Sequence, residues 1–157
     1  MQGEARVIDE LNARLAEELT AINQYMVHAE MCEDWHFGRL AEPIKKRSIV
    51  EMKHAERLIE RILFLDGRPI VSNLNPIHIG ATVPDMHAND LAAEVDAVKA
   101  YNESIRICAE LKDDGTKEML EAVLADEEGH VDWLEAQVHQ ITEIGYERYL
   151  ITQTEED

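Results

Sequence analysis

The sequence predicts an all-α protein, a bundle of four long helices followed by a short fifth helix, and two observations support this fold class. Apolar residues recur at intervals of three and four along four separate segments, which is the spacing of one face of an α-helix. The link over 68–81, between the second and third segments, is long and contains Pro, Asn and Gly residues. A bundle needs such a link when its second and third helices run parallel and the chain must cross its length.

The 157 residues are expected to form a single domain over 1–157. The bundle is predicted over about 4–145, the fifth helix over 146–153 and an acidic tail over 154–157.

The first helix is predicted from about Glu4 to Cys32 or slightly beyond. Its stripe contains one acid, Glu18, among apolar and aromatic residues: Val7, Leu11, Leu15, Ile22, Tyr25 and Ala29. An unpaired carboxylate is costly to bury, so Glu18 is expected either at a boundary or in a paired, functional position. Gly38 is expected to end this helix in the left-handed conformation.

The second helix is predicted to begin near Glu42, with Pro43 in its first turn, and to end at Asp66. Met52 lies about 100° around this helix from Glu51. Ile59 is seven residues further on and shares the face of Met52. The second helix is therefore expected to have a second apolar side, which something outside its own bundle must cover.

Capping residues predict where the third and fourth helices begin and end. Thr82 is predicted to cap the third helix, and the run 113–115, Asp-Asp-Gly, is predicted to break it. The fourth helix is predicted to begin near Thr116 and to end at Gly145.

The chain is strongly acidic, with 33 acidic residues against 15 basic ones and a formal net charge of −18. This balance argues against nucleic acid or an anionic membrane surface as a partner and suits a protein that attracts cations. No apolar run approaches the roughly 18 residues of a membrane span, and the first twenty residues do not resemble a signal peptide. Cys32 and Cys108 are too few for a disulfide framework, so reduced thiols and a cytoplasmic location are expected.

Two copies of the pattern Glu-x-x-His carry the strongest functional signal, at Glu51 with His54 and at Glu127 with His130. Residues three apart lie about 60° apart around a helix, so one turn can present a carboxylate and an imidazole to one metal ion. A single copy is common in acid-rich helices. Here, however, Glu18 precedes Glu51 by 33 residues and Glu94 precedes Glu127 by the same 33.

Four carboxylates and two imidazoles from four helices match the ligand pattern of di-iron helical bundles. They can bind two divalent ions, and ligation by oxygen and nitrogen without thiolate suits iron or manganese. Two adjacent Fe(II) ions can each give one electron to one molecule of dioxygen or peroxide. The six residues are therefore expected to form a ferroxidase centre, with its ligands Glu18, Glu51, His54, Glu94, Glu127 and His130.

Three further residues are expected near this centre. Tyr25 and Tyr101 each lie seven residues beyond a lone glutamate, on the same helix face. Each tyrosine either serves the site or is a buried side chain with a paired hydroxyl. Asp126 precedes Glu127 and could orient the imidazole of the other pair, whereas the corresponding position in the first half is Val50.

The sequence resembles bacterioferritin, the haem-containing bacterial member of the ferritin superfamily. The resemblance extends from the first helix to Tyr149 and is carried by three runs: ELTAINQY at 18–25, EMKHAERLIERILFLDG at 51–67 and DEEGHVDWLE at 126–135. It implies a ferritin-like four-helix bundle with a short fifth helix. It also implies assembly of two-fold dimers into a hollow shell of twenty-four subunits, and oxidation of Fe(II) by dioxygen or hydrogen peroxide at the six ligands. The ferric mineral would be stored inside, and a ferredoxin-type protein could donate electrons for iron release.

Bacterioferritins also hold a b-type haem between two subunits, each of which donates one methionine to the haem iron. Met52 matches that ligand, and the alternative is that Met52 is ordinary interface packing. Some bacterioferritins bind an additional iron on the inner surface through a histidine and an aspartate. This chain has Lys46 and Val50 at those positions, so that accessory site is not expected.

Other interpretations remain open at this stage. A di-iron peroxidase of the rubrerythrin type would share the ligand pattern, but such proteins usually carry paired Cys-x-x-Cys motifs, which this sequence lacks. A haem-binding or purely structural helical shell would leave the glutamates without metal. DNA-protecting mini-ferritins fit poorly, because their iron site lies between subunits and their tails are often basic. The remaining histidines are expected to be surface or packing residues: His28, His36, His78, His87 and His139.

Overall fold

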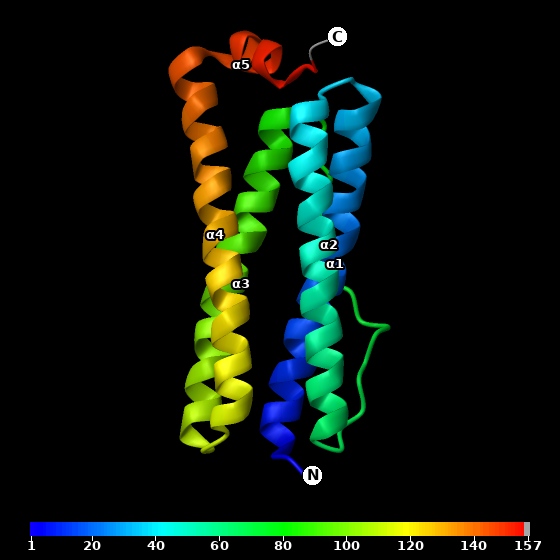
Figure 1. The fold of residues 1–157 in the computed structure, drawn as a ribbon, viewed down its shortest axis with the longest axis vertical. Coiled ribbons are helices and arrows are strands. Elements are labelled where there is room, and N and C mark those ends of the chain that lie inside the picture. The colour runs from blue at the N-terminus through cyan, green and yellow to red at the C-terminus, as the bar shows by residue number, and fades with distance from the viewer. Residues whose placement is uncertain (156–157) are drawn as a thin grey trace.

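Five helices make up most of the chain in a computed structural model, which describes residues 1–155 (Figure 1). The four long helices are α1 (Ala5–Asp34), α2 (Gly38–Phe64), α3 (Val83–Glu110) and α4 (Asp114–Ile144), and the short one is α5 (Tyr146–Gln153). The described residues contain no β-strand. The predicted all-α fold is therefore confirmed, while the last two residues of the predicted acidic tail, 156 and 157, lie outside the described range.

Helices α1 and α2 form one antiparallel pair and α3 and α4 form the other, with α5 lying across one end of the bundle (Figure 1). The segment between α2 and α3 runs back along the outside of the first pair, so α2 and α3 run in the same direction. This is the parallel arrangement that the length of the link predicts.

The segment over 65–82, here called the crossover, is held against one side of α1 by hydrogen bonds from the crossover backbone to α1 side chains. Four of its amide N–H groups donate to α1 side chains at distances of 2.8–3.1 Å. The acceptors are Asn12, Thr20, Gln24 and His28, and the donors are Ile70, Asn75, His78 and Gly80. An irregular segment thus satisfies part of its backbone without secondary structure of its own.

His28 is one of the histidines expected at the surface or in packing, and it proves to be fully buried. Its Nε2 accepts from Gly80 N–H at 3.0 Å, so the ring proton lies on Nδ1, which faces Asp90 Oδ1 at 3.0 Å. Gln24 donates to the same Asp90 oxygen at 2.7 Å. This buried polar group joins α1, α3 and the crossover.

The bounds of α2 and α4 differ from those predicted, and α2 ends at Phe64 rather than Asp66. α2 begins at Gly38, about one turn before Glu42, because Leu40 and Ala41 are buried and hold the extra turn in the core. The left-handed residue between α1 and α2 is His36 (φ 60°) rather than Gly38. Pro43 consequently lies inside the helix, where it lacks the amide N–H of an ordinary residue.

At the other end of the bundle, α4 begins at Asp114 rather than Thr116. Asp113 accepts a hydrogen bond from Thr116 N–H at 3.0 Å and so caps the helix. Thr82 caps α3 as predicted, by accepting from Asp85 N–H. Gly145 ends α4 with φ 87°, a conformation that favours glycine.

The apolar core consists of two layers separated along the bundle. One layer contains Leu11, Leu15, Leu58, Ile62 and Leu120, among others, and includes Tyr101. The other lies towards α5 and contains Ala29, Leu40, Ile44, Met86 and Tyr149, among others, and includes Tyr25. The buried acids and histidines of the predicted site belong to neither layer.

None of the helices in the part of the chain that the structure describes is both long enough and apolar enough to cross a bilayer. Cys32 and Cys108 are both buried and free.

The turn between α3 and α4 is fastened to the end of α2, and this link gives a stability prediction. Asp113 binds Thr116 through both the amide and the hydroxyl, and Arg61 of α2 contacts both residues at 2.9–3.2 Å. Asp113→Ala is expected to lower stability by about 1–2 kcal/mol, because it removes a helix cap and a partner of a half-buried Arg61. Thermal unfolding followed by circular dichroism measures this change.

Thr82→Ala is the matched control, since the Thr82 cap is exposed and makes a single 3.3 Å contact. An Asp113→Ala protein that melts no lower than the Thr82→Ala protein would show that the Arg61 link contributes nothing.

Candidate metal centre

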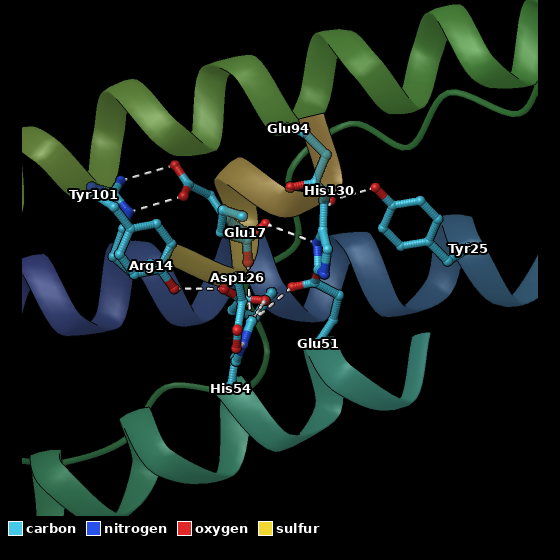
Figure 2. A network of polar contacts seen from close by, with 11 residues as sticks. Arg14, Glu17, Tyr25, Glu51, His54, Glu94, Tyr101, Asp126 and His130 are labelled. Atoms are coloured by element: carbon cyan, nitrogen blue, oxygen red, sulfur yellow. Dashed lines mark hydrogen bonds and ion pairs between the residues drawn. The ribbon is translucent and has the colours of Figure 1, made fainter. Parts of the chain in front are cut away.

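All four long helices contribute to one buried polar cluster at the middle of the bundle (Figure 2). Each of its six residues is less than one-tenth exposed. The structure thus brings together every residue that sequence spacing predicted for the site: Glu18 from α1, Glu51 and His54 from α2, Glu94 from α3, and Glu127 and His130 from α4.

The six residues form two overlapping groups of four. Glu18, Glu51, His54 and Glu127 make one group, here called subsite A. Subsite B consists of Glu51, Glu94, Glu127 and His130. Within each group the potential ligand atoms lie within 4.8 Å of one another, close enough to bind one ion. Glu51 and Glu127 belong to both groups, so their carboxylates are the ones placed to bridge two ions.

Both imidazoles direct Nδ1 towards the carboxylates. His54 Nδ1 lies 3.1 Å from Glu127 Oε1, 3.3 Å from Glu51 Oε2 and 3.6 Å from Glu18 Oε2. His130 Nδ1 lies 3.0 Å from Glu51 Oε1 and 3.4 Å from Glu94 Oε1. The two rings are stacked with their centroids 6.4 Å apart. Nδ1 is therefore the nitrogen of each ring that is available as a metal ligand.

Burial and the neighbouring acids separate the pKa values of the four carboxyl groups. Burial, and then the charge of Glu51, hold the pKa of Glu18 well above its usual range, and burial together with Glu127 raises the pKa of Glu94 to about 7. Burial acts to raise the pKa of Glu51 too, but its close contacts with Glu18 and both imidazoles outweigh it and lower that pKa to about 2. The same balance lowers the pKa of Glu127.

The imidazoles show the opposite change. Burial favours the neutral ring, but the carboxylates of Glu127, Glu51 and Glu94 at ion-pair distance outweigh it and raise the pKa of His130 to about 10. The pKa of His54 is raised for the same reason, chiefly by Glu127 and Glu18. Without cations, the cluster is therefore held together by protons on its imidazoles and on its two lone glutamates.

Several buried nitrogen and oxygen atoms of the cluster lack a hydrogen-bond partner. Glu18 Oε2, Glu51 Oε1, Glu94 Oε2 and His130 Nδ1 are buried and make no well-aligned hydrogen bond, although some lie at ion-pair distance. Buried polar atoms in proteins are almost always paired. Six oxygen and nitrogen donors without a thiolate suit two divalent ions such as Fe(II) or Mn(II). The residues present therefore fit a pair of cations.

The two tyrosines named from the sequence bind the lone glutamates crosswise. Tyr25 of α1 donates to Glu94 Oε1 of α3, and Tyr101 of α3 donates to Glu18 Oε1 of α1, the latter at 2.5 Å. Burial and the adjacent carboxylates hold the pKa of both phenols well above the usual range, so both remain donors. The sequence placed each tyrosine on the face of its own helix's glutamate, but the contact is with the glutamate of the other helix pair.

Asp126 lies where the sequence suggested, with Oδ2 2.8 Å from His54 Nε2. This contact fixes the outer nitrogen of the ring while Nδ1 faces the acids. In the described part of the chain, no hydrogen bond to His130 Nε2 is found, and the half-buried Val50 occupies the corresponding position. Only one imidazole is thus held by an acid from outside the cluster.

A cavity of about 400 Å³ reaches the acids between α1, α3 and the crossover. Its lining includes Asn75 and His78 of the crossover together with Glu17 and Asp96. Arg14 binds Glu17 at 2.9 Å, yet burial raises the pKa of Glu17 to about 7. The sequence did not single out Glu17 or Asp96, because both lie in acid-rich helices where adjacent carboxylates are common.

The remaining residues named from the sequence are not among the six residues of the cluster. Lys46 is exposed and pairs with Glu42 at 2.9 Å. Of the other histidines, His87 is buried with Nε2 3.1 Å from the Tyr149 hydroxyl, which fits the packing role expected for it, while His36, His78 and His139 are exposed.

Met52 is 45% exposed on the outer face of α2, as the helix phase predicted. Ile49, one turn earlier, is exposed as well. Ile59 is different: it is partly buried and packs against its own core layer, whereas Leu63 and Phe64, further along α2, are exposed.

Comparison with known proteins gives a consistent family. A family model described as a ferritin-like domain matches residues 8–144. Bacterioferritin from Brucella melitensis is 44% identical over 149 residues, which cover 95% of this chain and 92% of that protein. Bacterioferritin from Rhodobacter capsulatus is 46% identical over 145 residues (92% and 90%), and bacterioferritin from Mycobacterium avium is 40% identical over 149 residues (95% and 94%). Together with the five-helix fold, these matches show that the chain belongs to the bacterioferritins of the ferritin superfamily.

Proposed function

We propose that this protein oxidises Fe(II) at the buried cluster and stores the Fe(III) product. The observation that carries the proposal is the pair of four-residue groups that share Glu51 and Glu127. Two shared carboxylates hold two substrate ions side by side, while one lone glutamate and one imidazole bind each ion at its outer side. The cavity lined by Glu17 and Asp96 gives Fe(II) an approach to the cluster past carboxyl oxygens.

The chemistry requires two electrons, and two substrate ions supply them. Two Fe(II) ions and two protons convert dioxygen to hydrogen peroxide, or convert hydrogen peroxide to two molecules of water. The protein contributes fixed positions for both ions, a water-poor surrounding, and carboxylates whose negative charge favours the more highly charged Fe(III) product. Tyr25, Tyr101 and Asp126 hold three of the ligands in place through hydrogen bonds.

Storage requires a container, and membership of the bacterioferritins supports a shell of twenty-four subunits built from two-fold dimers.

We further propose a b-type haem between two subunits, with Met52 of each as axial ligand. The exposed thioether on an outer face of α2 supports this role. Two free buried thiols agree with a cytoplasmic location, and a ferredoxin-type electron donor for iron release completes the proposal.

Titration of the iron-free protein with Fe(II) under anaerobic conditions is expected to saturate near two ions per chain. Glu127→Ala is expected to lower the initial rate of Fe(II) oxidation by at least roughly a hundredfold, since loss of a ligand should exceed the effect of losing a ligand's hydrogen-bond partner. Stopped-flow absorbance of the Fe(III) product after mixing with oxygen measures the rate.

Glu128→Ala is the control, because Glu128 is the neighbouring acid but is exposed. Equal oxidation rates in the two variants would refute the proposed centre.

Binding of ions should release protons, because the metal-free cluster holds them at neutral pH. The pKa of His130 is raised to about 10 and that of Glu94 to about 7, and both groups must lose a proton to become ligands. Zn(II) affinity is therefore expected to fall as the pH is lowered from 8 to 6. Calorimetric titrations in buffers of different ionisation enthalpy are expected to show release of more than one proton per chain at pH 7, and no release would contradict the protonated cluster.

Met52→Leu is expected to remove the haem while leaving Fe(II) oxidation close to that of the parent, because Met52 lies outside both subsites. Met26→Leu is the control, since Met26 is also exposed, at 49% against 45%, but lies on α1. The Soret absorbance relative to protein absorbance measures haem content. Normal haem content in the Met52→Leu protein would disprove the ligand assignment.

A further inference from the structure

The residues of the site in the α1–α2 pair have counterparts in the α3–α4 pair, and only one residue lacks an equivalent counterpart. Each site residue of the α1–α2 pair corresponds to a site residue 76 positions later in the α3–α4 pair. Glu18, Tyr25, Glu51 and His54 correspond in this way to Glu94, Tyr101, Glu127 and His130.

The hydrogen bonds obey the same relation. Tyr25 binds Glu94 and Tyr101 binds Glu18, so each lone glutamate is held by the tyrosine of the other pair. His54 is likewise held from the other pair, by Asp126 at 2.8 Å.

The relation fails at position 50. The residue 76 positions before Asp126 is Val50, whose side chain cannot accept a hydrogen bond. His130 therefore lacks the partner that His54 has, and it is also more exposed, at 7% against 2%. The two subsites share both bridging carboxylates and have equivalent lone glutamates, so the imidazoles are the point at which they differ.

A fixed imidazole binds a metal ion more tightly than a free one, because the ring loses less conformational freedom on binding and its tautomer is already set. We infer that the two subsites differ in affinity, that the first divalent ion occupies subsite A, with Glu18 and His54, and that Val50 is the cause of the difference. Val50 is thus a residue that sets the order of loading, and Asp126 is the positioning residue on the tighter side.

This inference rests on the proposed function, since it assumes that the cluster binds two ions. Its consequence is that subsite B, with Glu94 and His130, fills last and empties first. A single bound ion gives only one electron. Oxidation by pairs of ions therefore waits for subsite B to be filled.

Titration of the iron-free protein with Zn(II) by calorimetry, repeated with Co(II) by absorption spectroscopy, tests the inference. The parent is expected to bind two ions in separate steps, with affinities that differ by roughly tenfold to a hundredfold. Val50→Asp is expected to tighten the second step and bring the two affinities together. Asp126→Val is expected to bring them together by weakening the first step.

Three further variants identify the cause and the order. Val50→Asn supplies a neutral acceptor of nearly the same size as aspartate, so it is expected to reproduce part of the Val50→Asp effect. His130→Ala is expected to retain the tight step, and His54→Ala is expected to lose it.

Each outcome decides a different point. Two equal steps in the parent, an unchanged ratio in Val50→Asp, or retention of the tight step in His54→Ala would overturn the inference while leaving a two-ion site intact. An effect of Val50→Asp that Val50→Asn does not share would assign the difference to added charge and would also overturn the role of a held imidazole. Failure of the parent to bind two ions at all would instead remove the proposed function.

Discussion

Burial of four carboxyl groups in one small volume is the constraint on which the rest of this structure depends. Charged groups lose favourable hydration in a bundle interior, and like charges at these distances repel one another. The protein compensates with two imidazoles inside the cluster and two phenols beside it. Such a cluster is stable either with protons or with divalent cations, and exchange between these two states is the chemistry of metal loading.

The bundle is built so that these acids stay together. The two apolar layers lie on either side of the cluster and include one of its tyrosines each, so the phenols are fixed by packing before they bind a carboxylate. The crossover is fastened along α1 by side chains spaced four and eight residues apart, and it closes one wall of the cavity. Packing thus supplies most of the stability, and polar contacts place the ligands.

The two-fold relation within the chain accounts for the two similar subsites of the proposed centre, and its failure at Val50 accounts for the inferred difference in their affinities. The hydrogen bond that His54 Nε2–H donates to Asp126 changes nothing in the set of ligands, yet it restricts how freely one ligand moves. The residue at position 50 is therefore expected to affect the order in which the two subsites bind ions. The same Val50, together with Lys46, is the reason that an additional iron site on the inner surface is not expected.

The sequence by itself determined the helices, the parallel arrangement of α2 and α3, and the six clustered acids and histidines, because helical periodicity fixes which residues share a face. It could not determine that Gly38 opens α2, that Tyr25 serves Glu94 and Tyr101 serves Glu18, or that Glu51 and Glu127 are the shared pair. These features depend on how far each helix is rotated and shifted relative to the others. Packing of the apolar layers sets that rotation, and only the tertiary structure shows it.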